Sequence, residues 1–146
     1  MIKHTATVTV NKPPAEVFKF VGTDYFSNHP KWDSRVVNVQ LDTQGPVKVG
    51  TKGRETCKQG GRSVTYDFEV TEFKPNSVIA FKAGRAPMDM TFTYNVKPVG
   101  DRQSELTIDV AMKPGGLMGL FEPFIAGGVK KEFSTITGGI KRMVEA

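Results

Sequence analysis

Apolar and polar residues alternate from the start of the chain, which is the pattern of a half-buried β-strand. Over residues 2–10 the polar positions are lysine and threonine, and the apolar positions share the opposite face. The proline-rich stretch 11–14 then ends the alternation. The first strand is therefore predicted to bury a face formed by Ile2, Ala6, Val8 and Val10, with His4 on the same side.

Two short helices are predicted after this strand. A proline suits the first turn of a helix, where its missing N–H costs nothing, and residues 14–21 then carry apolar side chains at helical spacing. The next segment, from Thr23 to Trp32, is interrupted by Pro30 and is expected to hold one brief helix.

Four turn signals divide the middle of the chain into antiparallel strands. Two-residue loops are predicted at Gly60-Gly61 and Gly84-Arg85, a four-residue turn at residues 74–77 and a three-residue loop at residues 100–102. These loops fix which residues face each other on neighbouring strands. The predicted pairs are Cys57 with Val64, Glu55 with Tyr66, Gly53 with Phe68, Phe73 with Val78, Val70 with Phe81, Phe81 with Met88, Ile79 with Met90, Tyr94 with Ile108 and Phe92 with Val110.

All four turns keep one phase, so a single face of the sheet collects the apolar side chains. The other face carries mainly threonine, aspartate and glutamate. Because a slip of one residue would mix the two sets, their separation supports the phase, and it predicts a sheet buried on one face and wet on the other. The apolar face is predicted to carry Val64, Tyr66, Phe68, Val70, Ile79, Phe81, Met88, Met90, Phe92, Tyr94, Val96, Leu106, Ile108, Val110 and Met112.

The last segment, from about Gly116 to Glu145, has apolar residues at spacings of three and four, which predicts a long helix with one apolar stripe. Pro123 and the glycine pair 127–128 weaken its first half. We expect this half to open as a gate to a pocket, with Phe121 and Phe124 as plugs. The alternative is that the glycines let the helix pack closely on the sheet.

Four short motifs support a family resemblance: residues 15–21 (AEVFKFV), 28–32 (NHPKW), 49–51 (VGT) and 140–145 (IKRMVE). With the order of elements, they resemble the START and pollen-allergen superfamily (SRPBCC), particularly its small bacterial polyketide cyclase/dehydrase and lipid-transport members. The resemblance covers essentially the whole chain. It implies an α+β helix-grip fold, in which residues 1–146 form one domain: a seven-stranded curved antiparallel sheet around a long C-terminal helix, with a ligand cavity between them.

The resemblance also implies that the cavity holds a small hydrophobic molecule such as a lipid or a polyketide, and some members catalyse cyclisation or dehydration there. Our first hypothesis is a binding or carrier protein without a cofactor. The second is a cyclase or dehydratase that uses a pocket acid, and the third is an interaction module whose core is filled. Aromatic and methionine side chains suit an apolar pocket wall. The candidate ligand-binding residues are Trp32, Tyr66, Phe68, Phe81, Met88, Met90, Phe92, Tyr94, Ile108, Phe121 and Phe124.

Glu55 is the candidate catalytic acid, because the predicted register places it on the apolar face opposite Tyr66. A buried carboxylate needs a partner or takes a raised pKa, and a Glu–Tyr pair could serve acid–base chemistry. If the hairpin loop had three residues, Glu55 would face outward instead. His29 and the single cysteine, Cys57, are more simply structural, although Lys58 could activate the thiol.

The remaining features narrow the functional classes. The net charge of +5 comes from scattered residues, with one cluster at Lys48, Lys52, Arg54, Lys58 and Arg62, so nucleic-acid binding is weakly supported. No histidine has a partner at metal-ligand spacing, so no metal site is predicted. One cysteine, no apolar run of membrane-spanning length and no signal-peptide pattern predict a cytoplasmic protein.

Overall fold

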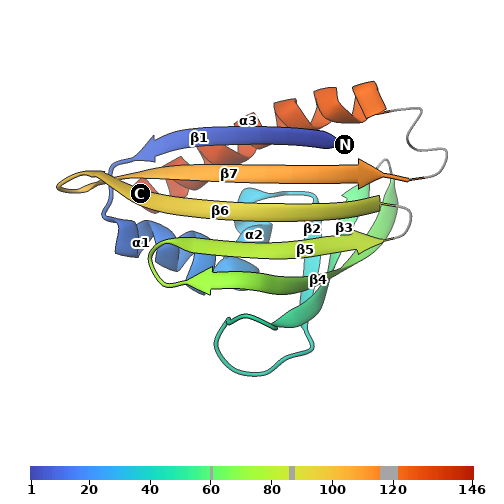
Figure 1. Ribbon diagram of the computed structural model, residues 1–146, viewed down its shortest axis with the longest axis horizontal. Coiled ribbons are helices and arrows are strands. Elements are labelled where there is room, and N and C mark those ends of the chain that lie inside the picture. Colours follow the sequence, from blue (N-terminus) through green and yellow to red (C-terminus); the bar gives the residue numbers. More distant parts are fainter. Residues whose placement is uncertain (60, 86–87, 116–121) are drawn as a thin grey trace.

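A seven-stranded antiparallel sheet forms most of the molecule, in the order β1-β7-β6-β5-β4-β3-β2. The computed structural model describes residues 1–59, 61–85, 88–115 and 122–146. Figure 1 shows the sheet curving in front of the helices. The strands are β1 (Ile2–Val10), β2 (Val36–Leu41), β3 (Lys52–Gln59), β4 (Arg62–Lys74), β5 (Val78–Arg85), β6 (Met88–Gly100) and β7 (Gln103–Pro114).

The connection from β1 to β2 crosses from one edge of the sheet to the other and carries the short helices. Helix α1 (Pro14–Phe18) begins with a proline, as the sequence predicts, and continues into a wider π-helical turn, η1 (Lys19–Thr23). Helix α2 (Tyr25–Trp32) contains Pro30, which lacks the N–H of a continuing helix, and ends two residues later. The long helix α3 (Glu122–Glu145) runs behind β1 and β7 (Figure 1).

The predicted register of the β3–β4 hairpin is confirmed. Gln59 pairs with Arg62, so the loop has two residues, and Glu55 lies opposite Tyr66. The β6–β7 pairs are confirmed as well, since Tyr94 lies opposite Ile108. The predicted three-residue loop at residues 100–102 is wrong, because Gly100 pairs with Gln103 and leaves a loop of two residues; a bulge between Pro98 and Gly100 restores the predicted pairs. The helix-grip arrangement therefore follows the sequence pattern.

The loop prediction at Gly84-Arg85 is wrong. Strand β5 continues through both residues, so Phe81 pairs with Phe92 rather than with Met88. Gly84 lies within the sheet between Asp67 and Asp89 and is not a turn residue. The register differs by four residues, an even number, so every side chain stays on its predicted face.

The turn after β4 is one residue shorter than predicted. Lys74, rather than Phe73, pairs with Val78, and Asn76 adopts a positive φ of 63°, a conformation that asparagine tolerates. A bulge between Val70 and Glu72 compensates for this change. Val70 consequently lies opposite Phe81, as the sequence predicts.

The helices pack on the apolar face of the sheet and enclose one core. Phe18 and Tyr25 come from the first helices, Leu106 and Ile108 from β7, and Ile140 from α3; each is almost completely buried. The threonine and acidic side chains of the strands lie on the opposite face, where Thr5 donates a hydrogen bond to Asp109 at 2.6 Å. One apolar and one wet face are therefore confirmed.

The glycines at the start of α3 do not serve close packing. A Cβ built at Gly127 or Gly128 meets no atom within 4 Å, and both residues are exposed. We expect Gly127→Ala and Gly128→Ala each to raise the free energy of unfolding, by up to about 1 kcal/mol, because alanine favours the helix. Thermal unfolding of the two variants checks this, and a loss of stability would contradict it. Phe121, and the side chain of Phe124, lie outside the described residues, so the gate stays a prediction.

Candidate functional site

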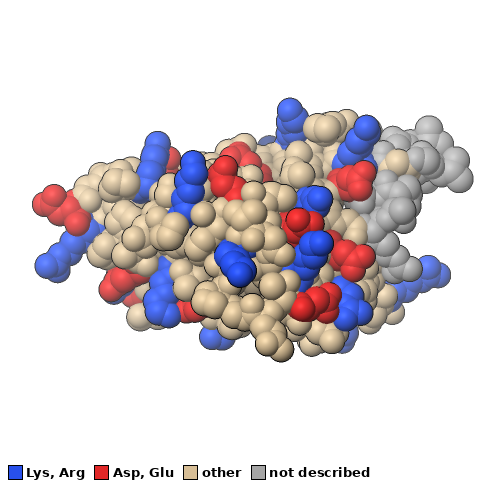
Figure 2. All heavy atoms as spheres, turned by 60° about the horizontal axis from the view of Figure 1, so that its bottom comes forward, with Lys and Arg blue, Asp and Glu red and all other residues tan. Residues whose placement is uncertain are grey.

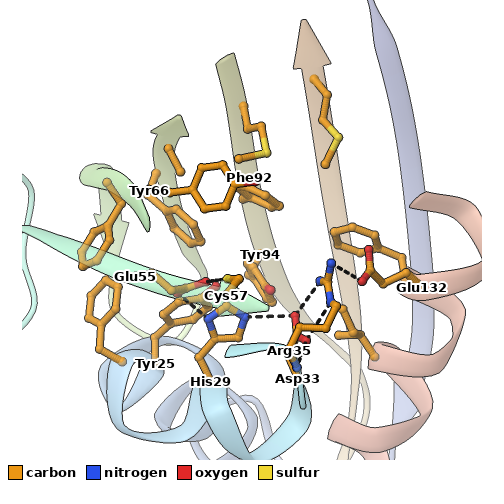
Figure 3. A pocket seen from close by; sticks show the side chains of 18 residues that line it. Tyr25, His29, Asp33, Arg35, Glu55, Cys57, Tyr66, Phe92, Tyr94 and Glu132 are labelled. Carbon is orange, nitrogen blue, oxygen red and sulfur yellow. Dashed lines mark hydrogen bonds and ion pairs between the residues drawn. The ribbon is translucent and has the colours of Figure 1, made fainter. Parts of the chain in front are cut away.

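A cavity of about 100 Å³ lies between the sheet and the helices. Strands β3 to β7 form its wall, α2 and the segment that joins it to β2 close one end, and α3 lies along its side (Figure 3). Its lining residues are Tyr25, Phe26, His29, Asp33, Arg35, Glu55, Cys57, Tyr66, Phe68, Phe81, Ala83, Met90, Phe92, Tyr94, Met112, Glu132, Phe133 and Ile136.

The cavity has an apolar part and a charged end. The rings of Phe81 and Phe92 stack with centroids 5.2 Å apart, and Phe133 of α3 stacks on Phe92 at 6.3 Å. Figure 3 shows the charged side chains gathered at the end formed by α2 and β2, away from Phe92 and Tyr66. An apolar wall with a few placed polar groups is the usual composition of a small-molecule site.

His29 is the centre of the charged end. Its Nδ1 lies 2.8 Å from Glu55 Oε2, and its Nε2 lies 3.7 Å from Asp33 Oδ2. Asp33 directly follows the last residue of α2, and its backbone N–H donates to the carbonyl oxygen of His29 at 3.1 Å, one helical turn back, which keeps the two residues together. Glu55 reaches the same point from β3, since the pleat directs it to the inner face of the sheet. The imidazole therefore lies between two carboxylates.

Arg35 extends this chain of charges to α3. Its Nε and Nη2 donate to the two oxygens of Asp33, at 3.1 and 2.8 Å, and its Nη1 makes an ion pair with Glu132. Bidentate pairs of this kind are geometrically specific and stronger than single contacts. The alternating series Glu55, His29, Asp33, Arg35 and Glu132 thus connects β3, α2, the segment before β2 and α3 around the cavity.

The environment of His29 favours its protonated form. Burial alone would lower the pKa, but the contacts with Asp33 and Glu55 outweigh it and raise the pKa of His29 to about 9. Burial would raise the pKa of Asp33, whereas the hydrogen bonds from His29 and Arg35 hold it far below its usual range. At neutral pH the site therefore contains an imidazolium next to an ionised aspartate.

The thiol of Cys57 and the hydroxyls of Tyr25 and Tyr94 stay protonated in the cavity. Burial, together with the nearby Glu55 carboxylate, raises the pKa of Cys57 to about 12, and the thiol donates to Glu55 Oε1 at 3.5 Å. Lys58 does not activate the thiol, contrary to the expectation from the sequence. Burial also raises the pKa of Tyr25 and of Tyr94, so both retain their hydroxyl hydrogen.

Six of the eleven predicted ligand-binding residues line the cavity: Tyr66, Phe68, Phe81, Met90, Phe92 and Tyr94. Trp32 and Ile108 do not line it. Trp32 packs against the rings of Tyr25 and Phe20, and Ile108 is completely buried in the core. The side chains of Met88 and Phe124, and all of Phe121, lie outside the described residues.

The sequence pattern does not identify the charged residues of the site other than Glu55. His29 was interpreted as structural, and Asp33, Arg35 and Glu132 were not singled out. The spacing of four between His29 and Asp33 is the one signal in the sequence, because residues four apart lie close together wherever a helix holds or ends between them. Nothing in the sequence pattern shows that α3 brings Glu132 to Arg35.

Two members of the predicted basic cluster, Lys52 and Arg54, lie beside carboxylates. Arg54 pairs with Asp42 at 3.1 Å, and Lys52 lies 4.0 Å from Glu69. Figure 2 shows acidic and basic side chains interspersed on the face that it presents. Among the described residues, no group of three or more histidine, cysteine, aspartate and glutamate side chains has the arrangement of a metal site. Within the same ranges, no helix combines the length and apolar character needed to cross a bilayer.

Solved structures share this fold at low sequence identity. A protein from Thermus thermophilus superposes with a TM-score of 0.79 at 13% identity, covering 97% of this chain and 96% of its own. An aromatase/cyclase from Streptomyces sp. R1128 superposes with a TM-score of 0.78 at 15% identity, covering 98% of this chain and 93% of its own. A START superfamily protein from Mycobacterium smegmatis superposes with a TM-score of 0.77 at 15% identity, covering 98% of this chain and 97% of its own.

At the sequence level, no curated protein matches the chain. The family described as polyketide cyclase/dehydrase and lipid transport matches residues 1–145. This match spans the strands, the helices and the cavity between them, and it agrees with the resemblance carried by the sequence motifs. The chain therefore belongs to the polyketide cyclase/dehydrase and lipid-transport family.

Proposed function

We propose that the protein binds a small hydrophobic molecule, of about one ring with a short polar arm, in the cavity between the sheet and α3. The observation that carries the proposal is the cavity itself, which is apolar along most of its wall and charged at one end. A volume of about 100 Å³ is of the order of the engineered cavities that hold one benzene ring. A filled interaction module would leave no such space.

A second candidate function is acid–base catalysis at the charged end, of the cyclase or dehydratase type. His29 is protonated at neutral pH and Glu55 accepts its hydrogen bond at 2.8 Å, so the pair offers a proton donor beside a carboxylate. Glu55 faces the cavity, as the predicted register requires, and Cys57 lies next to it. A catalytic role for Glu55 predicts that Glu55→Gln abolishes turnover of a bound substrate but leaves its binding measurable.

Ligand binding can be detected through the methionine methyl groups. Met90 and Met112 line the cavity, whereas Met1 and Met143 are exposed elsewhere. With methyl-labelled methionine, we expect titration with 2-phenylethanol to shift the NMR signals of Met90 and Met112 and to leave those of Met1 and Met143 unchanged. Equal shifts at all four, or none at the first two, would contradict binding in this cavity.

Filling the cavity should weaken this binding. Phe92→Trp adds volume to a ring that lines the cavity and stacks on Phe81, so we expect about a tenfold loss of affinity for 2-phenylethanol. Thr91→Trp is the matched control, because Thr91 is the preceding residue of β6 and is exposed on the opposite face. Normal binding by the Phe92 variant would place the ligand elsewhere.

A further inference from the structure

The charges that face the cavity do not balance. Three carboxylates line it, those of Asp33, Glu55 and Glu132, against two cations, His29 and Arg35. Among the described residues that line it, no other residue is an aspartate, glutamate, histidine, lysine or arginine, and burial raises the pKa of Cys57, Tyr25 and Tyr94, so these three stay neutral. With all five charged, the cavity wall therefore has one negative charge in excess.

Both cations are already occupied by carboxylates of the protein. His29 has Glu55 on one ring nitrogen and Asp33 beside the other. Arg35 donates to Asp33 through two nitrogens and pairs with Glu132 through the third. To bind an anionic group of a ligand, either cation would therefore have to give up one of its carboxylate partners.

Carboxylate oxygens, in contrast, remain available. In the described part of the chain, Glu132 has Arg35 as its partner through Oε1, and its Oε2 accepts no hydrogen bond. From the residues that the structure describes, Glu55 Oε1 accepts only the weak thiol donor of Cys57, at 3.5 Å. Burial raises the pKa of Glu132 even though Arg35 opposes the shift, as expected for a carboxylate whose charge is incompletely compensated.

We propose that the ligand is an organic cation, an amine whose ammonium group lies against Glu132 and whose hydrocarbon body lies among the aromatic side chains. This proposal rests on the proposed function and specifies the chemical class of its ligand. Of the described residues that line the cavity, eight are phenylalanine or tyrosine, and aromatic rings attract a desolvated cation through their π-systems. The aromatic residues are Tyr25, Phe26, Tyr66, Phe68, Phe81, Phe92, Tyr94 and Phe133.

Three probes of similar size test the charge preference: 2-phenylethylamine, 2-phenylethanol and phenylacetate, which are cationic, neutral and anionic at pH 7. Affinities come from the Met90 and Met112 methyl shifts of the wild-type protein. We expect the amine to bind at least tenfold more tightly than the alcohol, and phenylacetate to bind more weakly than either. An alcohol or phenylacetate affinity that equals or exceeds that of the amine overturns the proposal.

Two variants assign the preference to Glu132. Glu132→Gln should reduce the ratio of amine to alcohol affinity to below about threefold. Glu105→Gln removes the same charge from the ion pair with Lys97 on the outer face and should leave the ratio unchanged. A full preference in Glu132→Gln overturns the role of Glu132. Should 2-phenylethanol alone shift the two methyl signals, the ligand class is wrong but the binding function stands; should no probe shift them, both fail.

Discussion

Replacing His29 with glutamine should lower the free energy of unfolding by about 3 kcal/mol near neutral pH. The change keeps a side chain that can donate one hydrogen bond but removes the cation between Glu55 and Asp33. These three side chains are only 7–17% exposed, so water cannot replace the lost charge. A buried carboxylate left without its cation is costly, and this variant leaves Glu55 without one and Asp33 with Arg35 alone.

The loss of unfolding free energy in His29→Gln should become smaller as the pH rises. The pKa of His29 is raised from 6.5 to about 9 in the folded protein. Its contribution to stability is therefore fully present below pH 6.5 and disappears as the pH rises through 9. Chemical denaturation of wild type and His29→Gln across pH 6 to 10 checks this, because other titrating groups cancel in the difference between the two proteins.

A second variant controls for the loss of packing. In Glu55→Gln with His29→Gln, both charges of the closest pair are absent, so the double variant should be more stable than the sum of the two single losses indicates. A stability difference between wild type and His29→Gln that stays constant up to pH 10 would show that the imidazole contributes through shape and not through its charge.

The sheet was predictable because side-chain alternation constrains it at every residue. The β3–β4 register follows from loop length, and Glu55 therefore faces the cavity as predicted. The three misplaced turns changed pairing partners but left the faces intact, one through an even shift and two through bulges. An error in the position of a turn can therefore change which residues pair across two strands and still leave each side chain on its predicted face of the sheet.

The charged end of the cavity was not predictable in the same way. His29 lies on a short helix, Asp33 directly follows that helix, and Glu132 comes from a helix about a hundred residues later in the chain. Their meeting depends on how α2 and α3 pack on the sheet, which no local periodicity records. The alternation of apolar and polar residues also does not predict where Trp32 lies relative to the cavity. Its packing against Tyr25 and Phe20 follows from the three-dimensional structure alone.

Gly53→Ala should destabilise the protein by about 3 kcal/mol, although alanine suits a strand better than glycine does. Gly53 is buried, and a Cβ at this position would lie 2.3 Å from the backbone oxygen of Gln40 and 2.5 Å from Cζ of Phe68. The ring of Phe68 could move, but the backbone oxygen belongs to β2, the edge strand that pairs only with β3. Relief of the contact therefore requires β2 to shift.

Two measurements distinguish the backbone contact from the ring contact. Adding Phe68→Leu to Gly53→Ala removes the clash with the ring but not that with Gln40, so the double variant should recover little stability beyond the cost of Phe68→Leu itself. Amide exchange in β2 should accelerate more than exchange in β6 and β7, since only β2 must move. Because Phe68 lines the cavity and stacks on Phe26 at 4.6 Å, full recovery in the double variant would instead place the constraint on the cavity wall.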